Sequence, residues 1–152
     1  MSSLFERVNQ AVVDAAKSKD SDRLLVLRTL VSDIRGVALK ASRKDITDED
    51  VMSALVKGVK QREDSISQFV SGNRADLAER ETFQVNVLKE FLPEQLGEDE
   101  VRKIVTETVE RIANGSEKSK KLMGLVMKEL NPQLKGKADM KFVNQILSTL
   151  LV

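Results

Sequence analysis

Four residue types that carry much of protein chemistry are missing from the chain: cysteine, histidine, tyrosine and tryptophan. The lack of cysteine excludes disulfides, thiol nucleophiles and cysteine metal sites, and it is typical of a reducing compartment. The lack of histidine removes the usual general base and the usual transition-metal ligand. Five phenylalanines are the only aromatic residues, so single-stranded bases would find little to stack on. We therefore expect no catalytic residue, no cofactor and no metal.

Long apolar runs are missing as well. No stretch approaches the ~20 apolar residues that a membrane span needs, and Glu6 interrupts the amino-terminal segment, so we expect neither a membrane span nor a signal peptide. A hydrophobic fraction of 41% with 32% charged residues over 152 positions indicates a soluble, helix-rich protein of one domain or two small ones. From these features we predict a cytoplasmic location.

The net charge of +1 conceals an uneven distribution. Residues 1–96 carry 15 Lys and Arg against 16 Asp and Glu, and residues 97–115 carry 3 against 5. Residues 116–152 carry 7 against 3, an excess of +4. This is a local basic surface rather than the strongly basic composition of a non-specific nucleic-acid binder, and we do not expect DNA as a partner.

Apolar residues recur at helical spacing along the whole chain, and no useful stretch alternates as a strand would. The pattern predicts an all-α fold, with a four-helix unit in residues 1–92 and a three-helix unit in residues 97–152. In the first unit, Ser3 is expected to cap a helix that runs to about Lys17. A polar break near 41–44 should end the second helix, and Thr47 with Asp50 has the spacing of a capping box that opens the third.

The remaining helix limits follow from turn and capping residues. A turn at 71–73 should separate the third and fourth helices, and Pro93 should end the fourth. A fifth helix is expected over 98–113, with acidic residues in its first turn. The next helix should stop at Asn131-Pro132, and Asp139 is a candidate N-cap for the last one.

Arg62 and Glu81 each interrupt an otherwise apolar helical seam. If the third and fourth helices fold back antiparallel about Gly72, the two charges fall at nearly the same level. An unpaired charge on a packed seam would cost several kcal/mol, so we predict a structural ion pair between them.

The segment Lys135-Gly136-Lys137 lies between the last two helices. Two cations flank a residue that tolerates positive φ, so the loop can present backbone N–H groups and ammonium groups to an anion. The alternative is an ordinary turn with solvated lysines. On spacing alone, the ordinary turn is the favoured interpretation.

Three nearby segments have a familiar arrangement: Gly124-x-Val126-Met127-Lys128, Gly136-Lys137-Ala138 and Val143-Asn144-x-x-Leu147. They resemble the tail domain of the B subunit of glutamyl-tRNA(Gln) amidotransferase, and more closely the free-standing GatB/YqeY family. Further matching segments occur in the expected order: Leu27-Arg28-x-Leu30-x-Ser32-x-Ile34, Lys60-Gln61-Arg62-x-Asp64-Ser65-Ile66, Arg74-x-Asp76-Leu77 and Leu92-Pro93-x-Gln95-Leu96.

The resemblance implies tRNA as a partner, because the tail of the amidotransferase contacts tRNA. Together with the basic composition of the last third, it gives these candidate RNA-binding residues: Lys128, Lys135, Gly136, Lys137, Lys141 and Asn144, with Lys57 and Lys60 as a second contact. We expect a non-catalytic binding module for tRNA or other structured RNA, associated with an amidotransferase or another tRNA-handling protein. The alternative is a helical adaptor that docks a partner enzyme without touching RNA.

The resemblance also implies a family label of carbon–nitrogen ligase with glutamine as amido-N-donor. A chain without cysteine and histidine makes its own glutaminase activity an unfavourable hypothesis, so the label would describe a complex. Ser116–Lys121 contains serine and lysine, but its density of charge argues against the dry pocket that a lysine base needs. Acidic residues at 48–50 and 98–100 lie at expected helix starts, where acids are favoured without a metal.

Overall fold

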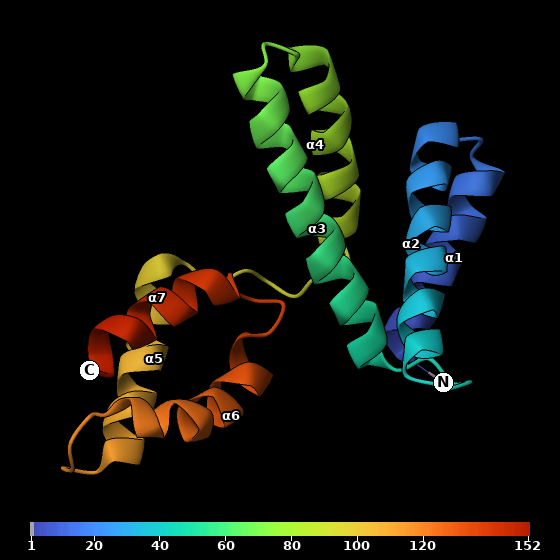
Figure 1. The fold of residues 1–152 in the computed structure, drawn as a ribbon. Coiled ribbons are helices and arrows are strands. Elements are labelled where there is room, and N and C mark those ends of the chain that lie inside the picture. Colours follow the sequence, from blue (N-terminus) through green and yellow to red (C-terminus); the bar gives the residue numbers. More distant parts are fainter. Residues whose placement is uncertain (1) are drawn as a thin grey trace. The chain divides into compact units, whose positions relative to one another are not determined.

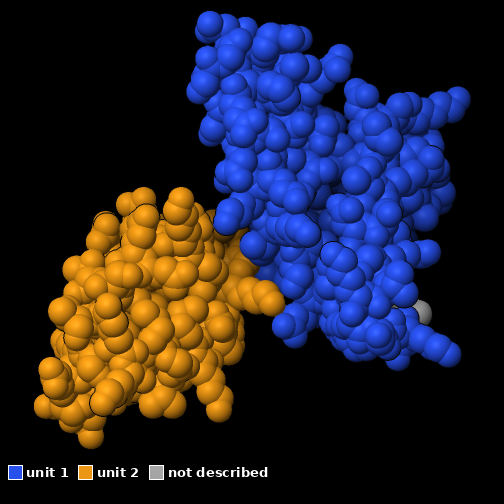
Figure 2. All heavy atoms as spheres, in the orientation of Figure 1, with its two compact units in different colours: residues 1–92 blue, residues 93–152 orange. Residues whose placement is uncertain are grey.

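The protein is described by a computed structural model that covers residues 2–152, and within those residues it contains helices and no strand. This confirms the all-α prediction. The helices are, in order, α1 (Ser3–Lys17), α2 (Ser21–Lys40), α3 (Asp48–Ser71), α4 (Ala75–Lys89), α5 (Glu98–Ala113), the short 3-10 helix η1 (Lys120–Leu122), α6 (Met123–Leu134) and α7 (Met140–Leu150) (Figure 1). The chain divides into two compact units, Met1–Leu92 and Pro93–Val152, which are coloured separately in Figure 2.

Unit 1 (residues 1–92) consists of two helical hairpins, α1 with α2 and α3 with α4, as Figure 1 shows. Helix α2 packs against α1, α3 and α4, so it joins the two hairpins. The core is formed by apolar residues that recur along one stripe of each helix. Its most deeply buried members include Val8, Leu27, Ile34, Leu55 and Leu88.

The start of α1 lies one residue earlier than predicted, because Ser2 and not Ser3 is the N-cap. The Ser2 hydroxyl accepts a hydrogen bond from the Phe5 N–H at 3.0 Å and donates one to the Asp48 carboxylate. The Leu4 N–H also donates to Asp48 Oδ1, at 3.2 Å. The first turn of α1 is therefore bonded to the first turn of α3, a pairing that local spacing could not reveal.

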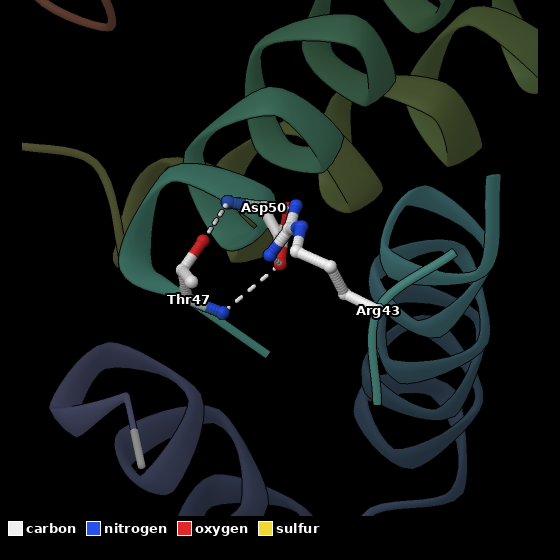
Figure 3. A network of polar contacts seen from close by, with 3 residues as sticks. All are labelled: Arg43, Thr47 and Asp50. Atoms are coloured by element: carbon white, nitrogen blue, oxygen red, sulfur yellow. Dashed lines mark hydrogen bonds and ion pairs between the residues drawn. The ribbon is translucent and has the colours of Figure 1, made fainter. Parts of the chain in front are cut away.

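The predicted capping box at the start of α3 is confirmed. The Asp50 N–H donates to the Thr47 hydroxyl at 3.2 Å, and the Thr47 N–H donates to Asp50 Oδ2 at 2.9 Å. Arg43, in the connection that precedes Thr47, donates from both terminal nitrogens to the same carboxylate, one of them at 2.9 Å (Figure 3). The Arg43 guanidinium and the Thr47 N–H lower the pKa of Asp50 to about 2. One buried carboxylate thus holds the α2–α3 connection against the first turn of α3.

Arg62 does not pair with Glu81, and this prediction is wrong. Its Nε donates to Gln84 Oε1 at 2.8 Å, and one terminal nitrogen donates to the Gly58 carbonyl at 3.0 Å. The bend between α3 and α4 is centred on Asn73, which has φ +58°, rather than on Gly72. Arg62 and Gln84 are equally distant in sequence from Asn73, whereas Glu81 lies almost one helical turn nearer to the bend.

Two helices end at places other than those predicted. Helix α4 ends at Lys89, and the chain then turns through Glu90, Phe91 and Leu92, whose N–H groups bond to carbonyls three residues earlier at 3.2–3.3 Å. Helix α6 does not stop at Asn131-Pro132 but runs to Leu134 with the proline inside it. Proline removes one N–H group and restricts the residue before it, but these effects do not prevent the last helical turn from forming. The Lys135 N–H still donates to the Asn131 carbonyl at 3.0 Å.

Unit 2 (residues 93–152) is built around α5, which packs against both α6 and α7 (Figure 1). Helix α5 begins and ends where the sequence predicts, and left-handed residues at Asn114 and Gly115 follow it. The core of unit 2 is separate from that of unit 1 and contains Val101, Val105, Val109, Val126, Leu130, Leu134, Val143, Leu147 and Leu151. None of the helices in residues 2–152 combines the length and apolar character that a membrane crossing needs.

Candidate nucleic-acid interface

The loop between α6 and α7, Lys135–Ala138, is tightly folded. Gly136 adopts φ +79°, a conformation that glycine tolerates. The Lys135 N–H donates to the Asn131 carbonyl at 3.0 Å, and the N–H groups of Lys137 and Ala138 both donate to the Leu134 carbonyl, at 2.9 and 3.0 Å. These N–H groups cap α6, so they do not point to an external anion. These three N–H groups are therefore not available to an anion, and the lysine side chains supply the positive charge of the loop.

Two groups from the segment before α5 hold this loop in place. The Gln95 side-chain amide donates to the Gly136 carbonyl at 2.6 Å, and the Leu96 N–H donates to the Lys137 carbonyl at 2.9 Å. Gly136 is buried under these contacts although it lies between two charged residues. We call Gln95 and Leu96 the loop anchor. No local spacing rule predicts it, although Gln95 belongs to one of the segments that carry the family resemblance.

The predicted RNA-binding residues of unit 2 lie on one loop and the helices beside it. Lys128 on α6, Lys135 in the loop, and Lys141 and Asn144 on α7 are exposed, while Lys137 is half-buried. Helices α6 and α7 pack mainly on α5 and make few direct contacts with each other. Lys135 and Lys137 lie in the loop, and Lys141 lies in the first turn of α7. Lys128 lies about two helical turns before the loop.

A hollow of about 410 Å³ opens between the start of α5 and the start of α7. Lys141 and Gln145 line it, together with the carboxylates of Glu98 and Asp139. Asp139 is the N-cap of α7, as predicted, and accepts a hydrogen bond from the Lys141 N–H at 2.9 Å. Because two acids share the hollow with one lysine, the hollow itself is not a strongly attractive site for phosphate.

The wall of this hollow contains the Phe142 ring, and the Arg102 guanidinium of α5 lies 5.1 Å from the centre of that ring. Such a contact fixes the ring and covers part of its face. Groups of acidic residues with metal-ligand geometry are absent from residues 2–152. The hollow is thus a polar depression beside the basic loop.

The two candidates in unit 1 have different surroundings. Lys57 lines a groove between α2 and α3, whereas Lys60 is exposed outside that groove. Gln61 also lines the groove, and Arg62 is held by Gln84. The structure therefore places Lys57 in a formed depression and leaves Lys60 on the open surface of α3.

Comparison with known proteins gives a family match over most of the chain. The family described as Yqey-like protein matches residues 5–151. A relative from Schizosaccharomyces pombe, named as an uncharacterized protein, is 38% identical over 87 residues, which cover 57% of this chain and 70% of the relative.

Other relatives carry the name altered inheritance of mitochondria protein 41, mitochondrial. The one from Pyrenophora tritici-repentis is 29% identical over 145 residues, which cover 93% of this chain and 77% of the relative. The one from Lachancea thermotolerans is 35% identical over 75 residues, covering 49% of this chain and 40% of the relative. These names contradict the predicted cytoplasmic location, because they assign the relatives to mitochondria. Composition alone could not distinguish the two compartments, since both are poor in disulfides.

Proposed function

Because the chain belongs to the Yqey-like protein family, we propose that it is a non-catalytic module that binds structured RNA, tRNA in particular, through the basic surface of unit 2. The three-helix unit carries the main contact, and the four-helix unit adds a weaker one. The module acts beside a tRNA-dependent amidotransferase or another tRNA-handling enzyme. The carbon–nitrogen ligase label would then belong to the complex.

One observation carries this proposal: seven lysines stand against three acids in residues 116–152, and the loop anchor holds the backbone of the α6–α7 loop. A positioned basic loop loses less side-chain and backbone freedom on binding than a mobile one. This part of the chain contains no arginine and one phenylalanine. Lysine ammonium groups recognise phosphates as point charges, so the support is for phosphate contact and shape recognition rather than base readout. The exposed Asn144 can add a hydrogen bond.

The test is a titration of folded tRNA at several salt concentrations, with the parent and the double variant Lys135→Ala/Lys137→Ala. Each ammonium–phosphate contact releases condensed counterion, so three or four contacts give a log–log salt slope of roughly −2 to −4. The double variant should bind every tRNA species more weakly and flatten the slope by about two. Its melting temperature should equal that of the parent.

A matched control removes the same charge elsewhere in unit 2. Lys120 and Lys121 are exposed residues of η1 and are not among the candidate residues. The Lys120→Ala/Lys121→Ala variant should keep a salt slope closer to that of the parent. If the parent fails to bind tRNA at ~50 mM salt, where electrostatic binding is strong, the protein is an adaptor. If the Lys135/Lys137 variant binds as the parent does, the loop is a solvated turn.

A further inference from the structure

Helices α2 and α3 of unit 1 leave a groove of about 310 Å³ between them. Its apolar lining consists of small residues, Gly36 and Val37 from α2 and Ala54 and Gly58 from α3. The volume is at the lower end of the range that binds small molecules, roughly 300–1,000 Å³. The groove shares no residue with the basic loop of unit 2.

Packing within the protein does not explain why residue 36 is a glycine. It lies inside α2, where glycine is less favourable than alanine, yet a Cβ atom built on it would meet nothing within 4 Å. Gly58 differs, because a Cβ atom there would come within 3.2 Å of both Leu88 and Arg62. A side chain at 58 would thus crowd the α3–α4 hairpin, whereas at 36 nothing in residues 2–152 stands in its way. A residue without a side chain lets a ligand approach the backbone closely.

On each helix of the groove, the lysine lies nearer to the α2–α3 connection than the other polar lining residues do. Lys40 is the lining residue of α2 nearest to the α2–α3 connection, and on α3 Lys57 lies between Ala54, which is nearest to the connection, and Gln61. Asp33 and Gln61 line the groove farther from that connection. The structure, over the residues it describes, gives no ion pair to Lys40, Lys57 or Asp33 and no hydrogen bond to the Gln61 side-chain amide. The side of the groove toward the connection thus favours an anion, and the side away from it favours hydrogen-bond donors.

We propose that this groove binds a guanine nucleotide, free or within RNA. The phosphate binds Lys40 and Lys57, the planar base lies on Gly36 and Val37, and the Watson–Crick edge of the base faces Asp33. Gln61 supplies a further donor and acceptor beside the base. This site is independent of the tRNA contact in unit 2.

Guanine is chosen over the other bases by the chemistry of Asp33. A carboxylate only accepts hydrogen bonds, and it can accept two at once. Guanine presents two adjacent donors on this edge, the N1–H and the exocyclic amino group. Adenine and cytosine place a ring acceptor beside their amino group, and uracil places carbonyl oxygens on both sides of its single N–H. In those three cases a lone pair would face the carboxylate.

The first experiment follows backbone amide signals of the full chain by NMR during titration with GMP, IMP, AMP and inorganic phosphate. GMP should shift the amides around Gly36 and Lys57 at the lowest concentration. IMP lacks the exocyclic amino group, so it should bind about tenfold more weakly, as expected for loss of one hydrogen bond to a charged group. Equal shifts for GMP and AMP would overturn the guanine assignment. Shifts with inorganic phosphate equal to those with GMP would also overturn it.

Variants then separate binding from folding. Gly36→Ala should raise the melting temperature, because the space is open and the helix gains a better former, and it should weaken GMP binding. Asp33→Asn should remove the preference for GMP over AMP, and Lys57→Ala should weaken all nucleotides. The matched charge control is Lys44→Ala, an exposed residue of the connection outside the groove. A Gly36→Ala protein that binds GMP as tightly as the parent would overturn the proposal.

The source of the nucleotide is distinguished with short single-stranded RNAs that contain one guanosine or none. Shifts of the groove amides with the guanosine RNA alone identify RNA as the ligand, and stronger binding of free GMP identifies a mononucleotide. The Lys135→Ala/Lys137→Ala protein should bind GMP as the parent does, so failure of tRNA binding leaves this result unaffected. Absence of shifts with both GMP and the guanosine RNA rejects the site.

Discussion

Asp50 is a buried charge, with 3% of its side chain exposed to solvent. A carboxylate in that position would ordinarily be protonated, because desolvation disfavours its charged form. Here the Arg43 guanidinium and the Thr47 N–H donate to it, and these hydrogen bonds outweigh the desolvation, so that its pKa falls from 3.8 to about 2. The carboxylate therefore joins the connection before α3 to the first turn of α3 as an ionised group.

We predict an acid-sensitive contribution to stability from this residue. Its folded pKa lies below the ordinary value, so the stabilisation is fully present above pH 3.8 and is lost as the pH falls toward 2. The shift corresponds to about 2 kcal/mol. Urea unfolding between pH 6 and pH 2 measures the free energy of unfolding of the parent and of Asp50→Asn. The two values should differ most near pH 6 and converge near pH 2.

The control for this prediction is Glu129→Gln. The pKa of Glu129 is lowered by the side-chain hydrogen bond from Arg111, but this pair is exposed and lies in unit 2. Exposed pairs contribute little to stability, so the variant should follow the pH profile of the parent closely. A difference between parent and Asp50→Asn that stays constant down to pH 2 would show that the carboxylate charge is not the source of the stabilisation.

At the scale of helices, the α3–α4 hairpin depends on the position of its bend. Asn73 takes the left-handed conformation, and the Arg74 N–H bonds to the Phe69 carbonyl at 2.8 Å. This fixes which residues of α3 and α4 face each other. Arg62 thereby meets the neutral amide of Gln84, and its charge is satisfied without a carboxylate.

We predict that Gln84→Ala destabilises the protein more than Glu81→Ala does. Loss of the Gln84 oxygen leaves Arg62 Nε without its acceptor in a half-buried position, which costs about 1–3 kcal/mol. Glu81 has no such partner, so its replacement should change the free energy of unfolding by no more than about 0.5 kcal/mol. Urea unfolding of both variants at neutral pH measures this. If Glu81→Ala destabilised the protein more than Gln84→Ala, the result would instead support an ion pair between Arg62 and Glu81.

Features of the fold that depend on residues a few positions apart were predictable from the sequence. The capping box of Thr47 and Asp50, the limits of α5 and the N-cap at Asp139 all follow from local hydrogen-bond geometry. The end of α6 was missed because proline forbids only part of a helical turn. The partner of Arg62 was missed because a shift of the bend by one position changes every opposing pair along the hairpin.

The candidate site was predictable to a smaller extent. The residue types indicated a loop at Gly136 in which positive φ is tolerated, but they did not indicate that N–H groups of the loop cap α6. The anchor from Gln95 to Gly136 joins residues 41 positions apart, and no local rule gives such a pairing. The groove between α2 and α3 was not predicted either. The missing side chain at Gly36 forms part of a groove only because α3 packs beside α2.

At the scale of the whole molecule, we predict that the purified chain has no glutaminase, amidase or ATP-dependent ligase activity of its own. The sequence provides neither cysteine nor histidine, and it has no glycine-rich loop of the kind that cradles phosphates. Assays of ammonia release from glutamine and of ATP hydrolysis, with protein of verified purity, should give the rate of the buffer blank. Turnover that a single substitution in this chain abolishes would contradict the prediction.

The loop anchor also determines where unit 2 can be cut from the rest of the chain. Helix α5 starts at Glu98, so a fragment that began there would look complete by its helices and would still contain all seven lysines of the last third. It would nevertheless lack the Gln95 amide and the Leu96 N–H that hold the carbonyls of Gly136 and Lys137. A fragment that begins at Pro93 keeps both. Binding measured on the shorter fragment would report on a released loop, not on the surface that the intact chain presents.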